Sequence, residues 1–215
     1  MNSALVIQST LAFGQAFLVG RMNPKVLTIK KQMKNTSLKN GGLKMVLSWI
    51  VVFAVRLLPH RIPNVEGIMA TVMPFSRRYG YFASFAYAAL SIALFDLAVG
   101  KVGSWTVLTS MTYGVIAALS VRFFQNREGR RRDYVLFAVF GTIVYDVITG
   151  VLAGPLLFGQ PIAQAFLGQI PFTLWHLAGN IVLSALLSPL LYSWLIKNPE
   201  LETDVLWRRI ALKAV

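Results

Sequence analysis

Six mostly apolar segments follow one another along the chain, separated by short stretches that contain Lys and Arg. They cover residues 43–58, 65–75, 79–99, 105–124, 134–158 and 170–196. A helix needs about 20 mostly apolar residues to cross about 30 Å of hydrocarbon, and it pairs its own backbone groups there. The pattern therefore predicts an all-α integral membrane bundle of six transmembrane helices. The second segment is short, so we predict a partial or tilted helix that is entered through Pro63 and ends at Pro74.

The composition agrees with a membrane protein. Of the 215 residues, 56% are hydrophobic and 13% are charged, and the mean hydropathy is +0.61. A soluble domain of this size is much less apolar. The net charge of +13 does not predict nucleic-acid binding, because Lys and Arg lie between the apolar segments rather than on an aromatic-studded soluble surface. The absence of cysteine excludes disulfides, thiol chemistry and thiolate metal sites.

The basic residues predict the orientation. Clusters precede the first segment and follow the second, fourth and sixth, whereas the alternate loops hold only Arg61, Lys101 and no basic residue. If six segments cross, the positive-inside rule places every cluster in the cytoplasm. We therefore expect a multi-pass plasma-membrane protein with both ends of the bundle cytoplasmic. The clusters are Arg21, Lys25, Lys30, Lys31, Lys34, Lys39 and Lys44, then Arg77 and Arg78, then Arg127 and Arg130 to Arg132, then Lys197, Arg208, Arg209 and Lys213.

The membrane domain is predicted to comprise residues 43–197, with a different segment at each end. Residues 1–42 form a basic N-terminal extension, in which residues 4–20 are an interrupted apolar stretch with no basic residues before it. A secretory signal is not expected there. The extension is either a marginal or interfacial helix or a start-site artefact, with the native start at Met22, Met33 or Met45. Residues 198–215 are predicted to be a cytoplasmic tail, either an interfacial helix or a solvated segment.

Three carboxylates lie within or beside the predicted spans: Glu66, Asp96 and Asp146. Polar groups in hydrocarbon are costly unless they are paired or line a watery cavity, so each indicates a possible site. Glu66 is alternatively a solvated acid at a helix start, and Asp96 is alternatively paired with Lys101. Asp146 is a ligand contact, a cation site or a buried partner of Tyr145 or Lys101.

Two polar stripes run along the fifth and sixth predicted helices. Gln169, Thr173, His176, Asn180, Ser184 and Ser188 are spaced by 4, 3, 4, 4 and 4 residues, which places them on one helix face. Thr142, Tyr145, Asp146 and Thr149 repeat the pattern. The small hydroxyl residues, and the pair Gly150 and Gly154, are also typical of helix packing. With the predicted orientation, the larger polar groups lie toward the outer leaflet.

No enzymatic motif is complete. The spacing of His176 and Asn180 is similar to that in rhomboid intramembrane proteases, but no Gly-x-Ser occurs and the only other histidine is His60. Neither a P-loop nor a glycine-rich dinucleotide motif is present. We therefore expect no enzymatic activity, no cofactor and no metal site in this chain.

Three stretches carry a resemblance to a known family: residues 56–66 (RLLPHRIPNVE), residues 94–101 (LFDLAVGK) with Trp105, and residues 170–180 (IPFTLWHLAGN). Together they resemble the S components of energy-coupling factor (ECF) vitamin transporters. The resemblance implies a substrate-capturing subunit that topples in the bilayer, with ATPase subunits and a transmembrane coupling subunit as partners. Residues 45–56 lack the Ala-x-x-x-Ala docking pattern of many S components. Ser84 with Ala88, or Ala89 with Ala93, are the substitutes we expect.

The predicted function is uptake of a vitamin-like small molecule, held by hydrogen-bonding groups and aromatic walls. The expected substrate-binding residues are Asn64, Glu66, Asp96, Trp105, Tyr113, Tyr145, Asp146, Trp175, His176 and Asn180. One alternative is a scaffolding membrane protein of the cell-shape type, and another is a small autonomous secondary carrier that uses Asp146 for ion coupling. Stripes that converge on a pocket favour transport, whereas stripes dispersed between packed helices favour scaffolding.

Overall fold

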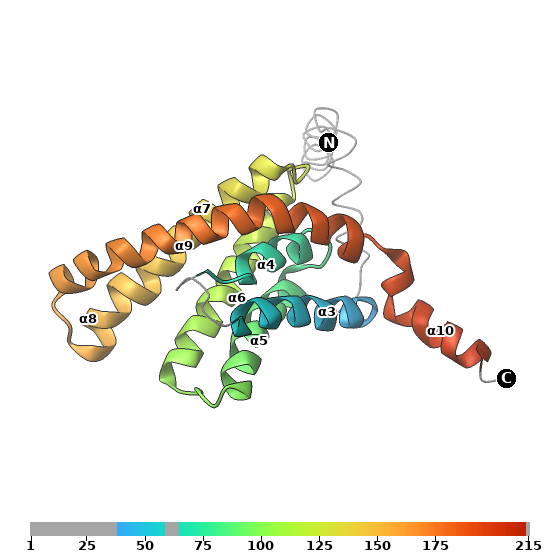
Figure 1. Ribbon diagram of the computed structural model, residues 1–215, viewed down its shortest axis with the longest axis horizontal. Coiled ribbons are helices and arrows are strands. Elements are labelled where there is room, and N and C mark those ends of the chain that lie inside the picture. Colours follow the sequence, from blue (N-terminus) through green and yellow to red (C-terminus); the bar gives the residue numbers. More distant parts are fainter. Residues whose placement is uncertain (1–37, 59–64, 214–215) are drawn as a thin grey trace, which may run out of the picture.

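The computed structural model describes residues 38–58 and 65–213, and these residues form helices and short connections without a strand. The predictions for residues 1–37, for Pro63 and for Asn64 lie outside the described residues. The helices are α3 (Leu38–Leu57), α4 (Ile68–Ser76), α5 (Tyr81–Ala98), α6 (Ser104–Phe124), α7 (Arg131–Asp146), α8 (Ala153–Phe158), α9 (Ile162–Leu191) and α10 (Thr203–Lys213). Figure 1 shows their arrangement.

Short π-helical turns lengthen two of these helices. Val147–Leu152 joins α7 to α8, and Tyr192–Ile196 extends α9 before a 3-10 turn at Pro199–Leu201. The last apolar helix begins at Ile162, eight residues earlier than predicted. Its first turns contain Gln164 and Gln169, and Pro171 lies inside the helix. These residues interrupt the apolar pattern without ending the helix, because neighbouring groups can satisfy the backbone around a proline.

Four helices are long and apolar enough to cross a membrane: Tyr81–Ala98, Ser104–Phe124, Arg131–Phe158 and Ile162–Ile196. The protein is therefore all-helical and has the composition of a membrane protein. The two remaining predicted spans are not among the four. The first, α3, is 20 residues long but carries Lys39, Lys44 and Arg56. The second, α4, has nine residues and a length of about 14 Å, which is too short to cross unaided.

Helix α4 forms the centre of the fold. All nine of its residues are buried, and it packs against α5, α6 and α9. A helix that is apolar on every side is stable when other helices surround it. Pro74 does not end α4 as predicted, because the helix continues to Ser76 and the backbone N–H of Arg77 donates to the carbonyl of Met73.

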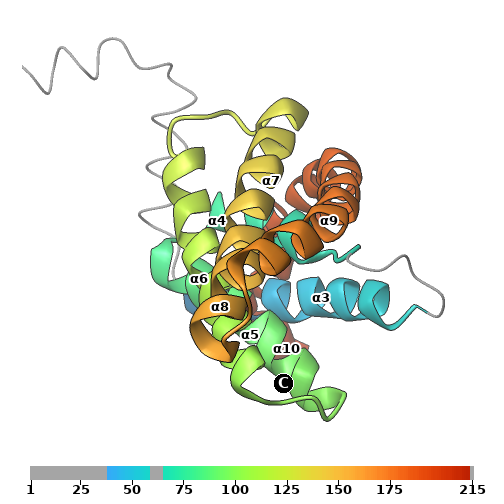
Figure 2. The same cartoon turned by 90° about the vertical axis from the view of Figure 1, so that its left-hand side faces the viewer.

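Two helical hairpins diverge from this centre. The hairpin of α5 and α6 and the hairpin formed by α7, α8 and α9 point in different directions (Figures 1 and 2). Gly114 permits the close packing of the first hairpin, since a Cβ at this position would lie 2.6 Å from the ring of Phe85. In the second hairpin, polar side chains of α7 and α9 contact each other.

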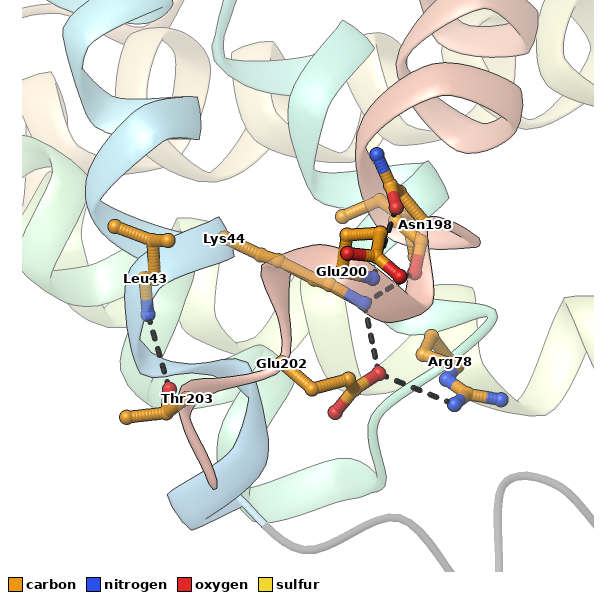
Figure 3. Close-up of polar contacts among 8 residues, drawn as sticks. Leu43, Lys44, Arg78, Asn198, Glu200, Glu202 and Thr203 are labelled. Atoms are coloured by element: carbon orange, nitrogen blue, oxygen red, sulfur yellow. Dashed lines mark hydrogen bonds and ion pairs between the residues drawn. The ribbon is translucent and has the colours of Figure 1, made fainter. Parts of the chain in front are cut away.

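A buried ion pair joins α3 to the segment that follows α9, residues 197–203 (Figure 3). Nζ of Lys44, which is fully buried, donates to the carbonyl of Ile196 at 2.9 Å and to Oε1 of Glu202 at 2.7 Å. Arg78 reaches the same Glu202 oxygen at 3.3 Å. Helix α10 follows this contact and extends away from the bundle in Figure 1, with Trp207 exposed.

Candidate functional site

The polar stripe of α9 faces the interior of the fold. His176, Asn180, Ser184 and Ser188 are all buried, with exposed fractions of 2% or less, whereas Gln169 and Thr173 at the beginning of the stripe are partly exposed. Residues spaced by three and four positions share one face of an α-helix, so the buried polar residues of α9 lie in one line. This line faces α7 over much of its length.

The stripe of α7 meets that line side chain by side chain. Oδ1 of Asp146 lies 2.8 Å from Nδ1 of His176, and both side chains are almost fully buried. Nearby, Nδ2 of Asn180 donates to Oγ1 of Thr142 at 2.8 Å. The sequence predicted both stripes, and the structure brings them together as two direct pairs.

Each pair leaves polar atoms without a partner. Among the described residues, Oδ2 of Asp146, Nε2 of His176, Oδ1 of Asn180 and the hydroxyl of Tyr113 have no hydrogen-bond partner and are buried. An unsatisfied buried polar atom costs about 1–3 kcal/mol. Several such atoms on neighbouring helices are typical of a place where a polar ligand completes the hydrogen bonding.

Aromatic rings hold the imidazole of His176. The rings of Tyr145 and Phe172 contact it edge-on, with centroid distances of 5.6 and 5.7 Å. Tyr113 packs against Tyr145 with the ring centroids 4.5 Å apart. These contacts orient the ring with Nδ1 facing Asp146, and Nε2 has no partner among the described residues.

An ion pair between Arg56 and Glu66 lies beside the aromatic residues. Glu66 was predicted as a site residue, but Arg56 was not. Nη2 of Arg56 lies 3.6 Å from Oε1 of Glu66, and the guanidinium covers the ring of Phe95 at 3.9 Å. A Cβ at Gly179 would lie 2.9 Å from the side chain of Val65, so the residue before Glu66 packs against α9 next to Asn180. Nε and Nη1 of Arg56 have no partner among the described residues. In the sequence, Arg56 is a single basic residue in the last turn of an apolar segment, and the acid Glu66 precedes the next helix. This pattern could have predicted the pair.

We call Arg56, Glu66, Tyr113, Tyr145, Asp146, His176, Asn180 and Thr142 the central polar cluster. It joins the end of α3 and the approach to α4 with α6, α7 and α9, which are distant in sequence. The chemical groups are a guanidinium, two carboxylates, an imidazole, an amide, two phenols and a hydroxyl. They can donate to and accept from a small polar solute at several points.

Three other predicted residues lie elsewhere. Trp105 and Trp175 are 47% and 55% exposed, so they do not form the inner aromatic walls that we expected. Asp96 accepts a hydrogen bond from Oγ1 of Thr106 at 2.7 Å near the turn between α5 and α6. The alternative prediction paired Asp96 with Lys101, but the described residues show no ion pair between these two side chains.

The small residues expected to dock a coupling subunit are largely internal. Ser84 and Ala88 are fully buried, Ala89 is 8% exposed and Ala93 is partly exposed. The first pair therefore offers no surface to a partner in this conformation. Docking through Ala89 and Ala93 stays a prediction.

A cavity of about 220 Å³ lies between α7 and α9, at the end of the two stripes. Asp146, Gln169 and Thr173 supply its polar atoms. The other lining residues are apolar, among them Ile143 and Leu174, which are 46% and 63% exposed. A Cβ at Gly150 would overlap the amide of Gln169, so glycine allows this side chain to lie against the π-helical turn Val147–Leu152. The stripes thus meet at the pairs of Asp146 with His176 and of Thr142 with Asn180, and they reach a cavity at one end.

In the part of the chain that the structure describes, no three His, Cys, Asp or Glu residues are grouped as a metal site requires. Comparisons with protein-family models, curated proteins and solved structures find no match to this chain.

Proposed function

We propose that this protein is a substrate-capturing membrane subunit for the uptake of a vitamin-like small molecule. The supporting observation is the central polar cluster, in which Asp146, His176 and Asn180 are buried in a largely apolar helical protein and keep unpartnered polar atoms. Ionisable residues in membrane helices are costly and are retained mainly for binding or transport.

The chemistry of the cluster suggests the kind of solute. Asp146, Glu66 and the unpartnered amide oxygen of Asn180 accept hydrogen bonds, and Arg56 donates them. The rings of Tyr113 and Tyr145 offer flat apolar contact. A small heterocyclic molecule with both donors and acceptors uses all of these groups. Few polar groups among aromatic walls are typical of small-molecule sites.

The proposed topology adds α3 and α4 to the four long helices, with α4 as a short crossing. Six crossings place the basic clusters after α4, α6 and α9 on the same side as the beginning of α3. Both ends of the bundle are then cytoplasmic, in the plasma membrane. The sequence has no P-loop, so the energy for uptake comes from separate ATPase subunits and a transmembrane coupling subunit, as the resemblance to ECF S components implies. No cofactor is required in this chain.

Two observations favour other functions. The bond from Asn180 to Thr142, and the bond from Oγ of Ser188 to the carbonyl of Ala70 at 2.8 Å, are of the kind that hold helices together in a scaffold. The buried pair of Asp146 and His176 also suits proton coupling in an autonomous carrier. A scaffold, however, gains nothing from the unpartnered atoms of the cluster.

The test begins with mass spectrometry of small molecules that co-purify with the full chain. Binding of the solute found is then measured for the wild type, for the double variant His176→Ala with Asn180→Ala, and for Ser188→Ala as control. Ser188 lies on the same helix face, and its bond to Ala70 only joins helices. We expect the double variant to lose binding and the control to keep it.

Unchanged binding in the double variant contradicts the site. Purification of the folded chain without any bound small molecule favours the scaffold. Uptake by proteoliposomes that contain this chain alone favours the autonomous carrier.

A further inference from the structure

A second hollow lies where α6 ends and α7 begins, away from the central polar cluster. Its volume is about 490 Å³. Figure 2 shows the connection between the two helices at their upper ends. Both helices are long and apolar enough to cross a membrane, so their joined ends lie at the boundary of the hydrocarbon. The hollow is lined by Leu119, Arg122, Phe123, Asn126, Arg127, Phe137 and Phe140.

The charge around this α6–α7 hollow is strongly positive. Residues 122 to 133 contain five arginines, with Glu128 and Asp133 as the only acids. Arg127 pairs with Asp133 at 3.3 Å, and Arg130 pairs with Glu128 at 2.9 Å. Across the described ranges 38–58 and 65–213, Arg122, Arg131 and Arg132 have no ion-pair partner. The excess positive charge therefore faces solvent or lipid.

Arg122 lines the hollow from α6. It lies two residues before the end of α6 at Phe124, and its side chain is exposed. An arginine at this depth extends toward the headgroups, where a phosphate can accept two parallel hydrogen bonds from the guanidinium. Asn126, one turn further along, adds an exposed amide at the same rim.

The walls below Arg122 are apolar and exposed. Leu119 and Phe140 line the hollow and are 40% and 48% exposed. Val115 on α6 and Ile143 on α7, each about one turn deeper, are 47% and 46% exposed. The apolar surface thus continues from the hollow along the sides of both helices, in the direction in which lipid acyl chains run.

We propose that the α6–α7 hollow binds an anionic phospholipid, with Arg122 and Asn126 on the phosphate and the acyl chains along Leu119 and Phe140. A free inorganic anion makes no use of the apolar walls, and an acidic protein segment makes no use of their continuation into the membrane. Basic pockets between membrane helices are suited to anionic lipid headgroups. The positive-inside rule expects the site in the cytoplasmic leaflet. This inference does not depend on the proposed transport function.

The test uses the purified full chain in a mild neutral detergent. The midpoint of thermal unfolding is followed during titration with phosphatidylglycerol, phosphatidylcholine or sodium phosphate. We expect phosphatidylglycerol to raise the midpoint and the other two to leave it unchanged. Arg122→Gln should lower the affinity for phosphatidylglycerol roughly fivefold, from about 1 kcal/mol for one arginine near a lipid headgroup, so that about five times more lipid is needed for the same shift. Arg122→Lys should restore part of it.

Arg132→Gln is the matched control. It removes the same charge from an exposed arginine that does not line the hollow. We expect this variant to keep the wild-type response to phosphatidylglycerol.

Four outcomes overturn the proposal. Equal stabilisation by phosphatidylglycerol and phosphatidylcholine shows that the hollow does not select the headgroup. An equal loss of the phosphatidylglycerol response in Arg122→Gln and Arg132→Gln shows that the overall positive charge, and not the hollow, causes the response. Equal stabilisation by sodium phosphate assigns the hollow to a free anion. If Arg122→Gln keeps the wild-type response to phosphatidylglycerol but loses a membrane protein that co-purifies with the wild type, the α6–α7 hollow is a protein-binding site.

Discussion

Oδ1 of Asp146 lies 2.8 Å from Nδ1 of His176, and this contact links α7 to α9 across 30 positions of sequence. Both side chains are buried, and each keeps one polar atom without a partner among the described residues. The pair therefore joins the two helices and leaves Oδ2 and Nε2 without a partner.

Asp146→Ala tests this pair in stability and in binding. Removal of the carboxylate leaves the His176 imidazole buried without its partner, which costs about 1–3 kcal/mol in the free energy of unfolding. Asp146→Asn keeps the size and one acceptor oxygen, so we expect a smaller loss of stability. Thermal unfolding measures the stability, and titration with the co-purifying solute measures binding. Full binding by both variants contradicts a direct role of Asp146.

Arg56→Gln tests the residue that the structure adds to the cluster. The ion pair with Glu66 is mostly buried, with side-chain exposed fractions of 10% and 21%, so its loss should lower the free energy of unfolding by about 1–3 kcal/mol. Binding should fall by tenfold or more, because a hydrogen bond to a charged group contributes about 1.5–3 kcal/mol. Arg131→Gln, which changes an exposed arginine outside the cluster, is the control for charge. An equal response of the two variants contradicts the assignment of Arg56.

Gly114→Ala tests the packing between α5 and α6. The new methyl group would lie 2.6 Å from the Phe85 ring, so one of the two helices has to shift. Overpacking of this kind costs about 1–3 kcal/mol. Gly168→Ala is the matched control, because this helical glycine has no atom within 4 Å of a built Cβ. Alanine should stabilise α9 there by about 0.5–1 kcal/mol. The two thermal midpoints should move in opposite directions, and a shared direction contradicts the packing shown by the structure.

Lys44→Met tests the ion pair between Lys44 and Glu202, which joins the C-terminal segment to α3. Methionine keeps most of the buried volume and removes the bonds to Ile196 and Glu202, so Glu202 retains Arg78 alone. We expect faster amide hydrogen exchange from Lys197 to Thr203 and little change in α5 and α6. Lys197→Met, at an exposed lysine nearby, should leave the exchange unchanged. Equal protection in both variants contradicts a fastening role for Lys44.

The sequence alone predicted the membrane class and the two polar stripes. Apolar length determines whether a helix can cross, and residues at three- and four-residue spacing must share a helix face, so both inferences depend on local geometry. The long helices Ser104–Phe124 and Ile162–Ile196 agree with the first inference, and the buried line from His176 to Ser188 agrees with the second.

Only the tertiary structure decided which faces meet. Lipid and protein interior are both apolar, so hydrophobicity does not tell a buried face of a membrane helix from an exposed one. Trp105 and Trp175 were predicted as walls of the binding site, and they are 47% and 55% exposed. The pairing of Asp146 with His176, and of Arg56 with Glu66, depends on how separate helices cross. The sequence determined which residues are polar and which helix face they share, and packing determined their partners.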